Sequence, residues 1–264
     1  MKKVLVAVLG LLVGFVFACA RQATVDDVVA MVTKAIGGEQ TLAAITDQVS
    51  TWDFTMHQMP PAPPAEGQAD GQQAQPSGPQ TMPMTITYKR PNKIRFDSYN
   101  PDGALAWSSC YDGTKGWSMM MGQTMDANEA QNQESEAMVA TWLDGYLNYK
   151  DKGFTLAPLP AEMVEGISYM VLQVTDKHGN VQKIYINETT HLIEKQAGDM
   201  TNMQGAKEPM YMTFKNYSMV DGVNLAQHVA SYKADGTMIW EATLKEAKHN
   251  AGVEDSAFMA DATQ

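Results

Sequence analysis

Residues 81–121 read TMPMTITYKRPNKIRFDSYNPDGALAWSSCYDGTKGWSMMM, and apolar residues occupy alternate positions in four successive runs of this stretch. A period of two is typical of a β-strand that buries one face. Turn-forming sequences separate the runs: Arg90-Pro91-Asn92, Asn100-Pro101-Asp102-Gly103 and Asp112-Gly113-Thr114-Lys115-Gly116. The stretch therefore predicts four consecutive strands that form an antiparallel meander.

The segment before this meander combines helical and extended patterns. TVDDVVAMVTKAI at 24–36 has apolar residues at helical spacing behind a capping Thr24, and Gly37-Gly38 ends the pattern. A second short helix is predicted at 39–45. The alternation of apolar and polar residues in 51–56 predicts a first strand.

Residues 59–80, MPPAPPAEGQADGQQAQPSGPQ, contain no large apolar residue after Met59. Such a segment gains too little from burial to offset the entropy lost on ordering. We predict a disordered loop rich in proline, glutamine and glycine, placed within a hairpin. A proline-rich peptide ligand is a weaker alternative, because 60–64 lacks flanking basic anchors.

The period changes after residue 125. Residues 126–150 carry an apolar stripe at helical spacing and predict the longest helix, which ends near Gly153. Strand patterns then return at Ile167–Thr175, Val181–Asn187, Leu192–Gln196, Tyr211–Tyr217, Gln227–Tyr232 and Thr237–Lys245. The fold class is mainly β with helices (α+β): about ten antiparallel strands in one large sheet, covered by an N-terminal helix and a mid-chain helix.

The N-terminus has the pattern of an export signal. Two lysines precede an apolar run, Val4–Ala18, that is too short for a membrane-spanning helix. We predict a signal peptide at 1–20 and one domain at 21–264. Two processing routes stay open, because the residues around Cys19 fit ordinary cleavage after Ala20 and also form an imperfect lipobox that would place a lipid on Cys19. The expected location is the periplasm, either soluble or anchored through Cys19.

The charge composition excludes some classes of binding partner. The 264 residues include 30 acidic and 19 basic side chains, which gives a formal charge of -11. Nucleic acids and anionic lipid surfaces attract basic proteins, so neither is expected as an electrostatic partner. The predicted oligomeric state is a monomer.

No pattern in the chain predicts catalysis. The metalloprotease, nucleophile-elbow, phosphate-loop and paired-cysteine motifs are absent. The histidines occur singly, at His57, His178, His191, His228 and His249. We therefore expect a protein that is not an enzyme and that uses no cofactor and no metal.

Methionine is unusually frequent, with 20 residues. Thioethers in Met119-Met120-Met121, Met82 with Met84, Met200 with Met203 and Met210 with Met212 would suit Cu(I) in an exported protein. Core packing is the stronger interpretation, because most of them recur at strand period among other apolar residues. The same side chains would also make an adaptable wall for hydrophobic ligands.

Several segments share their order and spacing with a known family. They are Ala35-Ile36-Gly37-Gly38-Glu39, Tyr88 to Arg95, Tyr111-Asp112-Gly113 with Gly116-Trp117, Val164-Glu165-Gly166, Tyr185 to Ile193, Tyr217 to Val223, and Asn250 to Phe258. In this order they resemble LolA-type outer-membrane lipoprotein-sorting proteins. The sequence departs from the family in the insertion at 59–80 and at Asn224-Leu225-Ala226, where the family usually has a proline.

The resemblance implies an incomplete β-barrel, or strongly curved sheet, whose apolar concave face is covered by helices and receives acyl chains. It also implies an arginine that orients the lid. For the two arginines in the meander, Arg90 and Arg95, the strand pattern favours solvent-facing charges instead. Partners would be lipid or lipoprotein acyl chains, with a membrane-bound donor or acceptor protein.

A carrier or chaperone for lipoprotein acyl chains, or for other lipid, is thus the leading functional hypothesis. The predicted lipid-binding wall is Trp52, Phe54, Met84, Ile86, Phe96, Trp107, Trp117, Met119 and Met121, with Trp142 and Leu143 on the lid. An envelope-stress sensor or protein-binding scaffold on the same fold is the main alternative. A copper-binding protein is the third.

Overall fold

A 13-stranded antiparallel sheet dominates the computed structural model, which describes residues 23–57, 78–120, 122–201 and 206–260. The strands before the mid-chain helix are β1 (Asp47–Met56), β2 (Gln80–Lys89), β3 (Lys93–Tyr99), β4 (Leu105–Tyr111), β5 (Gly116–Met120) and β6 (Gln123–Asp126). Those after it are β7 (Thr155–Val164), β8 (Ile167–Thr175), β9 (Val181–Asn187), β10 (Ile193–Thr201), β11 (Lys207–Lys215), β14 (His228–Lys233) and β15 (Met238–His249). The predicted meander is confirmed.

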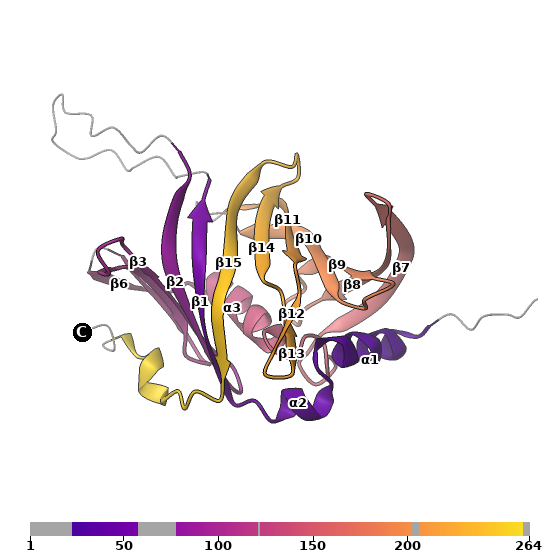
Figure 1. The fold of residues 1–264 in the computed structure, drawn as a ribbon, viewed down its shortest axis with the longest axis horizontal. Coiled ribbons are helices and arrows are strands. Elements are labelled where there is room, and N and C mark those ends of the chain that lie inside the picture. The colour runs from indigo at the N-terminus through magenta and orange to yellow at the C-terminus, as the bar shows by residue number, and fades with distance from the viewer. Residues whose placement is uncertain (1–22, 58–77, 121, 202–205, 261–264) are drawn as a thin grey trace, which may run out of the picture.

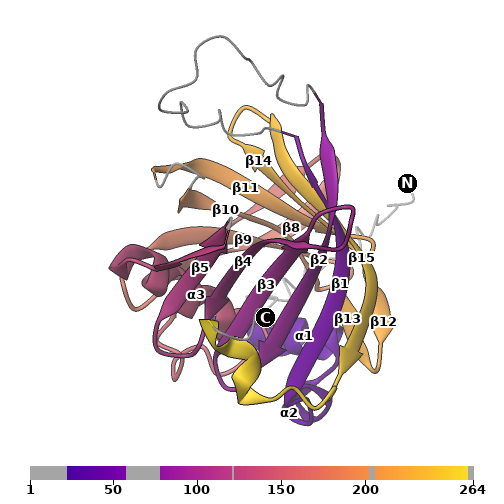
Figure 2. The same ribbon diagram turned by 90° about the vertical axis from the view of Figure 1, so that its left-hand side faces the viewer.

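The strand order is β6-β5-β4-β3-β2-β1-β15-β14-β11-β10-β9-β8-β7. The first and last strands of the chain therefore lie side by side at the centre, paired from Gln48 with His249 to Met56 with Trp240. This long-range pairing joins an N-terminal half-sheet to a C-terminal one. The sheet is strongly curved and open, with β6 and β7 at its edges (Figures 1 and 2).

Helices cover the concave side of the sheet at one end (Figure 1). They are α1 (Val25–Ile36), α2 (Glu39–Ala43) and α3 (Glu129–Thr141), and a hairpin of β12 (Ser218–Val220) and β13 (Val223–Leu225) packs beside α1. The last element, the 3-10 helix η1 (Asp255–Phe258), lies on the opposite, convex side (Figure 2). None of the helices in the described ranges is long and apolar enough to cross a membrane.

The predicted N-terminal helix is confirmed together with its cap. Thr24 Oγ1 accepts a hydrogen bond from the Asp27 backbone N–H, and the Asp27 carboxylate accepts one from the Thr24 N–H. Val28, Val29 and Val32 form its buried face. At its end, a side chain on Gly37 would meet the carbonyl oxygen of Gly222 at 2.7 Å, so only glycine allows the β12–β13 turn to approach this closely.

The predicted mid-chain helix was too long. Helix α3 ends at Thr141, and residues 142–153 continue as a series of turns. Gly145 and Asn148 have positive φ angles there, 53° and 55°, which a right-handed helix cannot contain. We call α3 together with 142–153 the cover.

The prediction of about ten strands missed β6, β7 and the β12–β13 pair. The strand β7 was missed because it contains Pro158 and Pro160, and proline has no backbone N–H to donate to a neighbouring strand. As an edge strand, β7 pairs only with β8, so its prolines break no central ladder. The predicted signal peptide, Cys19, Met121 and residues 59–77 lie outside the described residues.

Candidate functional site

The concave face of the N-terminal half-sheet carries an apolar cluster beneath the cover. Cross-strand pairs such as Trp52 with Met84, and Ile86 with Phe96, place these side chains on one face. Of the predicted wall and lid, this cluster contains Trp52, Phe54, Met84, Ile86, Phe96, Trp107, Trp142 and Leu143. We call it the N-terminal cluster.

The predicted face of Trp117 and Met119 was wrong. Both lie on the convex side, where they are buried with Cys110 and Phe258 of the C-terminal segment. The reason is the register of β4 with β5, which pairs Trp107 with Met120, so that odd-numbered residues of the two strands point to opposite faces. Met120, rather than Met119, shares the concave face with Trp107.

The cover closes the N-terminal cluster through apolar and polar contacts. Val139 and Leu143 are buried in the cluster. The Trp142 ring meets the Phe96 ring edge to face, with centroids 5.8 Å apart, and Trp142 Nε1 donates to Gln48 Oε1. The cover is therefore seated on the sheet face that the sequence assigned to it.

Arg90 holds the cover in place and is not a solvent-facing strand charge as predicted. Its Nε and Nη2 donate to the carbonyls of Ile45 and Leu42 at the end of α2, and its Nη1 donates to Asp144 of the cover. Lys152 Nζ donates to the other oxygen of Asp144 at 2.7 Å. One carboxylate of the cover thus pairs with two cations.

Arg95 also departs from the prediction. Its side chain is buried on the convex face and donates to Asp97 and to the Ala257 carbonyl. The guanidinium lies 5.4 Å from the Trp117 ring, within the range of a cation–π contact. Arg95 therefore anchors the C-terminal segment and takes no part in the concave site.

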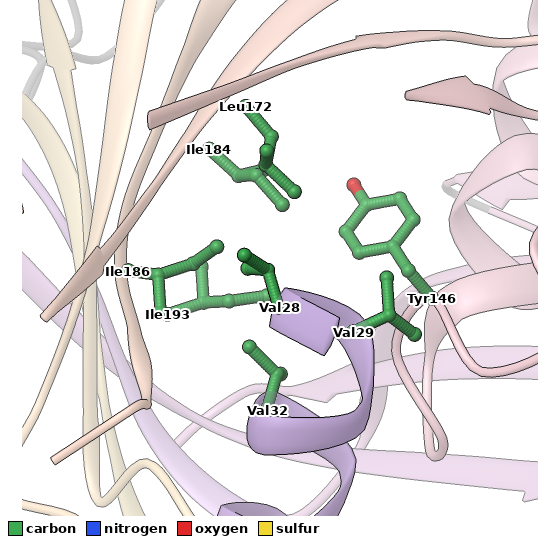
Figure 3. Close-up of a pocket in the computed structure, with 8 residues that line it drawn as sticks. All are labelled: Val28, Val29, Val32, Tyr146, Leu172, Ile184, Ile186 and Ile193. Carbon is green, nitrogen blue, oxygen red and sulfur yellow. The ribbon is translucent and has the colours of Figure 1, made fainter. Parts of the chain in front are cut away.

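A second apolar cluster lies on the concave face of the C-terminal half-sheet, beneath α1. Figure 3 shows Val28, Val29 and Val32 of α1 packed near Ile184 and Ile186, with Tyr146 of the cover beside them. The cavity that remains between these side chains has a volume of about 10 Å3, the space of a single water molecule. In this conformation the cavity is too small for an acyl chain, which could enter it only if α1 or the cover moved.

The sequence missed several residues of the concave face. Met56 of β1 is opposite Trp240 of β15, and the Trp240 ring centroid lies 5.5 Å from that of Phe54, which was part of the predicted wall. The same cross-strand rows continue through Val229, Met212 and Phe214. Their alternation was visible in the predicted strands, but only the pairing of β1 with β15 shows that they extend the same wall. These strands reach beyond the helices (Figure 1).

Polar chemistry is sparse on this face. Within the described ranges, no group of three or more histidine, cysteine, aspartate or glutamate side chains is arranged to hold a metal ion. On the opposite, convex face, His57 and His228 share the carboxylate of Glu241, each at 2.9 Å, and these hydrogen bonds lower the pKa of Glu241. The methionines are also divided, because Met82, Met84, Met210 and Met212 lie on the concave face and Met119 on the convex one.

Comparison with known proteins identifies the fold. No protein-family model and no curated protein matches the sequence. Three solved structures superpose over nearly their whole length. A putative outer membrane lipoprotein-sorting protein domain from Vibrio parahaemolyticus has a TM-score of 0.59 and 14% identity, covering 89% of this chain and 96% of its own. A LolA superfamily protein from Nitrosomonas europaea has 0.58 and 10%, covering 91% and 100%.

The third structure, a DUF1329 family protein from Desulfovibrio piger, has a TM-score of 0.58 and 12% identity, covering 91% of this chain and 99% of its own. At such low identity the likeness concerns the backbone alone. The chain thus has the LolA-like curved sheet that its sequence segments suggested.

Proposed function

We propose that this chain is an exported carrier or chaperone that binds the acyl chains of lipoproteins or other lipids against the concave face of its sheet, in outer-membrane lipoprotein sorting. One observation carries the proposal: every strand from β5 to β9 in the sheet order contributes an apolar side chain to that face. Examples are Met120 of β5, Trp107 of β4, Trp240 of β15, Met212 of β11 and Ile184 of β9. A soluble protein needs a ligand or a cover for a face of this kind.

The energetics suit reversible binding. Each methylene removed from water contributes about 0.8 kcal/mol, so an acyl chain gains substantially from contact with this wall. To reach the part of the wall beneath the helices, the acyl chain must displace α1 or the cover, because the cavity there is closed. The contacts that hold the cover include the pairs of Asp144 with Arg90 and Lys152 and the burial of Val139 and Leu143. An acyl chain that takes the place of these apolar side chains on the wall offsets the loss of their burial.

The test begins with protein purified from its native envelope without detergent. Mass spectrometry of an organic extract is expected to detect lipid, or an acylated protein, in stoichiometric amount. The purified chain is then stripped and titrated with monoolein, a neutral acyl lipid. A chain that carries no lipid and binds no monoolein would contradict the proposal and favour the protein-binding scaffold.

The place of action is tested separately. The intact mass of the mature chain distinguishes release after Ala20 from acylation of Cys19, since only the second adds acyl mass to the first residue. A membrane-bound donor or acceptor is expected to be captured by the lipid-loaded chain and to a lesser extent by the stripped chain. Equal capture by both forms would again favour the scaffold.

A further inference from the structure

A groove of about 490 Å3 lies between the cover and one end of the sheet. Two turns of the sheet form its other walls: the β2–β3 turn, which contains Arg90, and the β8–β9 turn, which contains Lys177 and His178. Its floor includes Tyr88 and Phe154, which belong to the buried clusters on the concave face. The volume lies within the range of about 300–1,000 Å3 typical of small-molecule sites.

Basic side chains from both turns and from the cover line this groove. Lys177 Nζ and His178 Nε2 lie 2.6 Å and 3.0 Å from the two oxygens of Glu136 on α3. On the opposite wall, Arg90 and Lys152 share the carboxylate of Asp144. Glu136 and Asp144 therefore each pair with two basic side chains. Around these two carboxylates, basic groups outnumber acidic ones.

The basic groups also have hydrogen-bond donors to spare. A guanidinium has five N–H donors and an ammonium has three. Hydrogen bonds to described residues use three of the Arg90 donors, two of those on Lys152 and one of those on Lys177. The remaining donors border a cavity large enough for a ligand, and phosphate oxygens are their strongest partners.

Two further carboxylates make the groove attractive to a positive group as well. Asp151 and Asp176 line the same space. Asp176 accepts hydrogen bonds from the backbone N–H groups of His178 and Asn180 within its own turn, so it is held in place. The lining as a whole is therefore close to electrically balanced, which disfavours a simple anion and favours a ligand that carries both charges.

We propose that this groove binds a zwitterionic phosphate ester of the phosphoethanolamine type. The phosphate oxygens accept hydrogen bonds from Arg90, Lys152 and Lys177, and the ammonium group lies toward Asp151. Both a free phosphate ester and a lipid head group have this chemistry. The groove borders the concave wall and shares Arg90, Asp144 and Lys152 with the contacts that hold the cover. The proposal does not require that an acyl chain binds to the wall.

The test is calorimetric titration of the purified chain with O-phosphoethanolamine at low ionic strength. Lys177→Gln is expected to weaken binding by about tenfold or more, because it removes a charged donor from a half-exposed turn where folding does not depend on it. Lys183→Gln is the matched control: this lysine is equally exposed but pairs with Glu162 outside the groove. Glycerol 3-phosphate, which lacks the ammonium group, is expected to bind more weakly than O-phosphoethanolamine.

A second probe identifies the source of the ligand. Dihexanoylphosphatidylethanolamine has the same head group on two short acyl chains. Comparable affinity for both probes supports recognition of the free ester, and binding of the lipid alone supports a head-group site, provided that Lys177→Gln weakens it. No binding of either probe, or equal binding by Lys177→Gln and the unmodified chain, would overturn the proposal. Monoolein has no phosphate, so its binding reports on the concave wall independently.

Discussion

Arg90 Nη1 lies 2.9 Å from Asp144 Oδ2, and this ion pair connects the β2–β3 turn to the cover. The same guanidinium donates to the carbonyls of Leu42, in α2, and of Ile45, which follows it. Three parts of the chain that are distant in sequence therefore meet at one side chain. Because the cover and α2 both border the concave face, Arg90 fixes the position of the elements that cover that face.

Asp144→Asn is expected to loosen the cover. The substitution removes the charge that Arg90 and Lys152 share, and the partly buried cations then lose their counterion. A loss of about 1–3 kcal/mol in the free energy of unfolding is expected from urea titration. Amide exchange is expected to accelerate in 142–153 and α3, with little change in the central strands.

Lys245→Gln is the control for this change. It breaks a salt bridge with Asp53 in which both side chains are about half exposed, so its expected cost is less than about 1 kcal/mol. Equal losses in the two variants would contradict a special role for Asp144. Unchanged exchange in 142–153 would show that apolar contacts alone hold the cover.

Trp240→Glu is expected to reduce monoolein affinity by about tenfold or more, because it places a charge in the apolar wall opposite Met56 and beside Phe54. Met163→Glu serves as the control, since Met163 is 76% exposed on edge strand β7. Circular dichroism and urea titration show whether each variant is folded. A folded Trp240→Glu protein that retains full affinity would remove the C-terminal half of the wall from the site.

Local sequence patterns predicted the type and position of individual helices and strands. The alternation in 81–121 and the capped apolar stripe of 24–36 identified the meander and α1, because strand and helix periods are local properties. The faces of Trp107 and Trp117 were a different matter. Both residues have odd numbers in strands with an alternating pattern, which suggested that they share a face. The register of β4 with β5 decides the matter: it puts Trp107 opposite Met120, so Trp117 faces the other side.

The pairing of strands that are distant in the chain could not be predicted from local patterns either. Nothing local in 238–249 indicates that β15 pairs with β1, and this pairing is what brings Trp240 next to Phe54. The contacts of the charged residues Arg90 and Arg95 could not be predicted from local patterns for the same reason. Each follows the strand pattern of a surface residue. In the folded chain, however, Arg90 binds carbonyls at the end of α2, and Arg95 binds the carbonyl of Ala257.

Phe258→Ala is expected to expose Cys110. The thiol is buried beneath Phe258, donates to its carbonyl and has a pKa that burial raises to about 12, so it should react slowly with a disulfide reagent. Loss of the ring is expected to increase the rate of thiol labelling by about tenfold or more, and to cost about 3–5 kcal/mol of stability. Met259→Ala is the control, because Met259 is 62% exposed. Unchanged labelling would place the protection of Cys110 elsewhere.

His249 is the buried titratable group from which a pH effect is expected. Its side chain is buried, with Nε2 3.3 Å from Gln48 Nε2 and Nδ1 3.6 Å from Asp221 Oδ2. Burial lowers the pKa of His249, and the carboxylates of Asp221 and Asp47 offset this only in part. In the unfolded chain the pKa is about 6.5. The unfolded state therefore binds more protons below that pH, and stability falls as the pH decreases through this value.

His249→Gln is expected to remove this share of the pH dependence. Urea titrations at about pH 7.5 and pH 5 should show a smaller loss of stability in the variant than in the unmodified chain. Glutamine keeps a polar group within reach of Gln48, so the comparison reports on protonation more than on packing. His191→Asn is the control, because His191 has a positive φ of 57° on a turn, which asparagine tolerates. The same loss on acidification in His249→Gln and the unmodified chain would show that another group causes it.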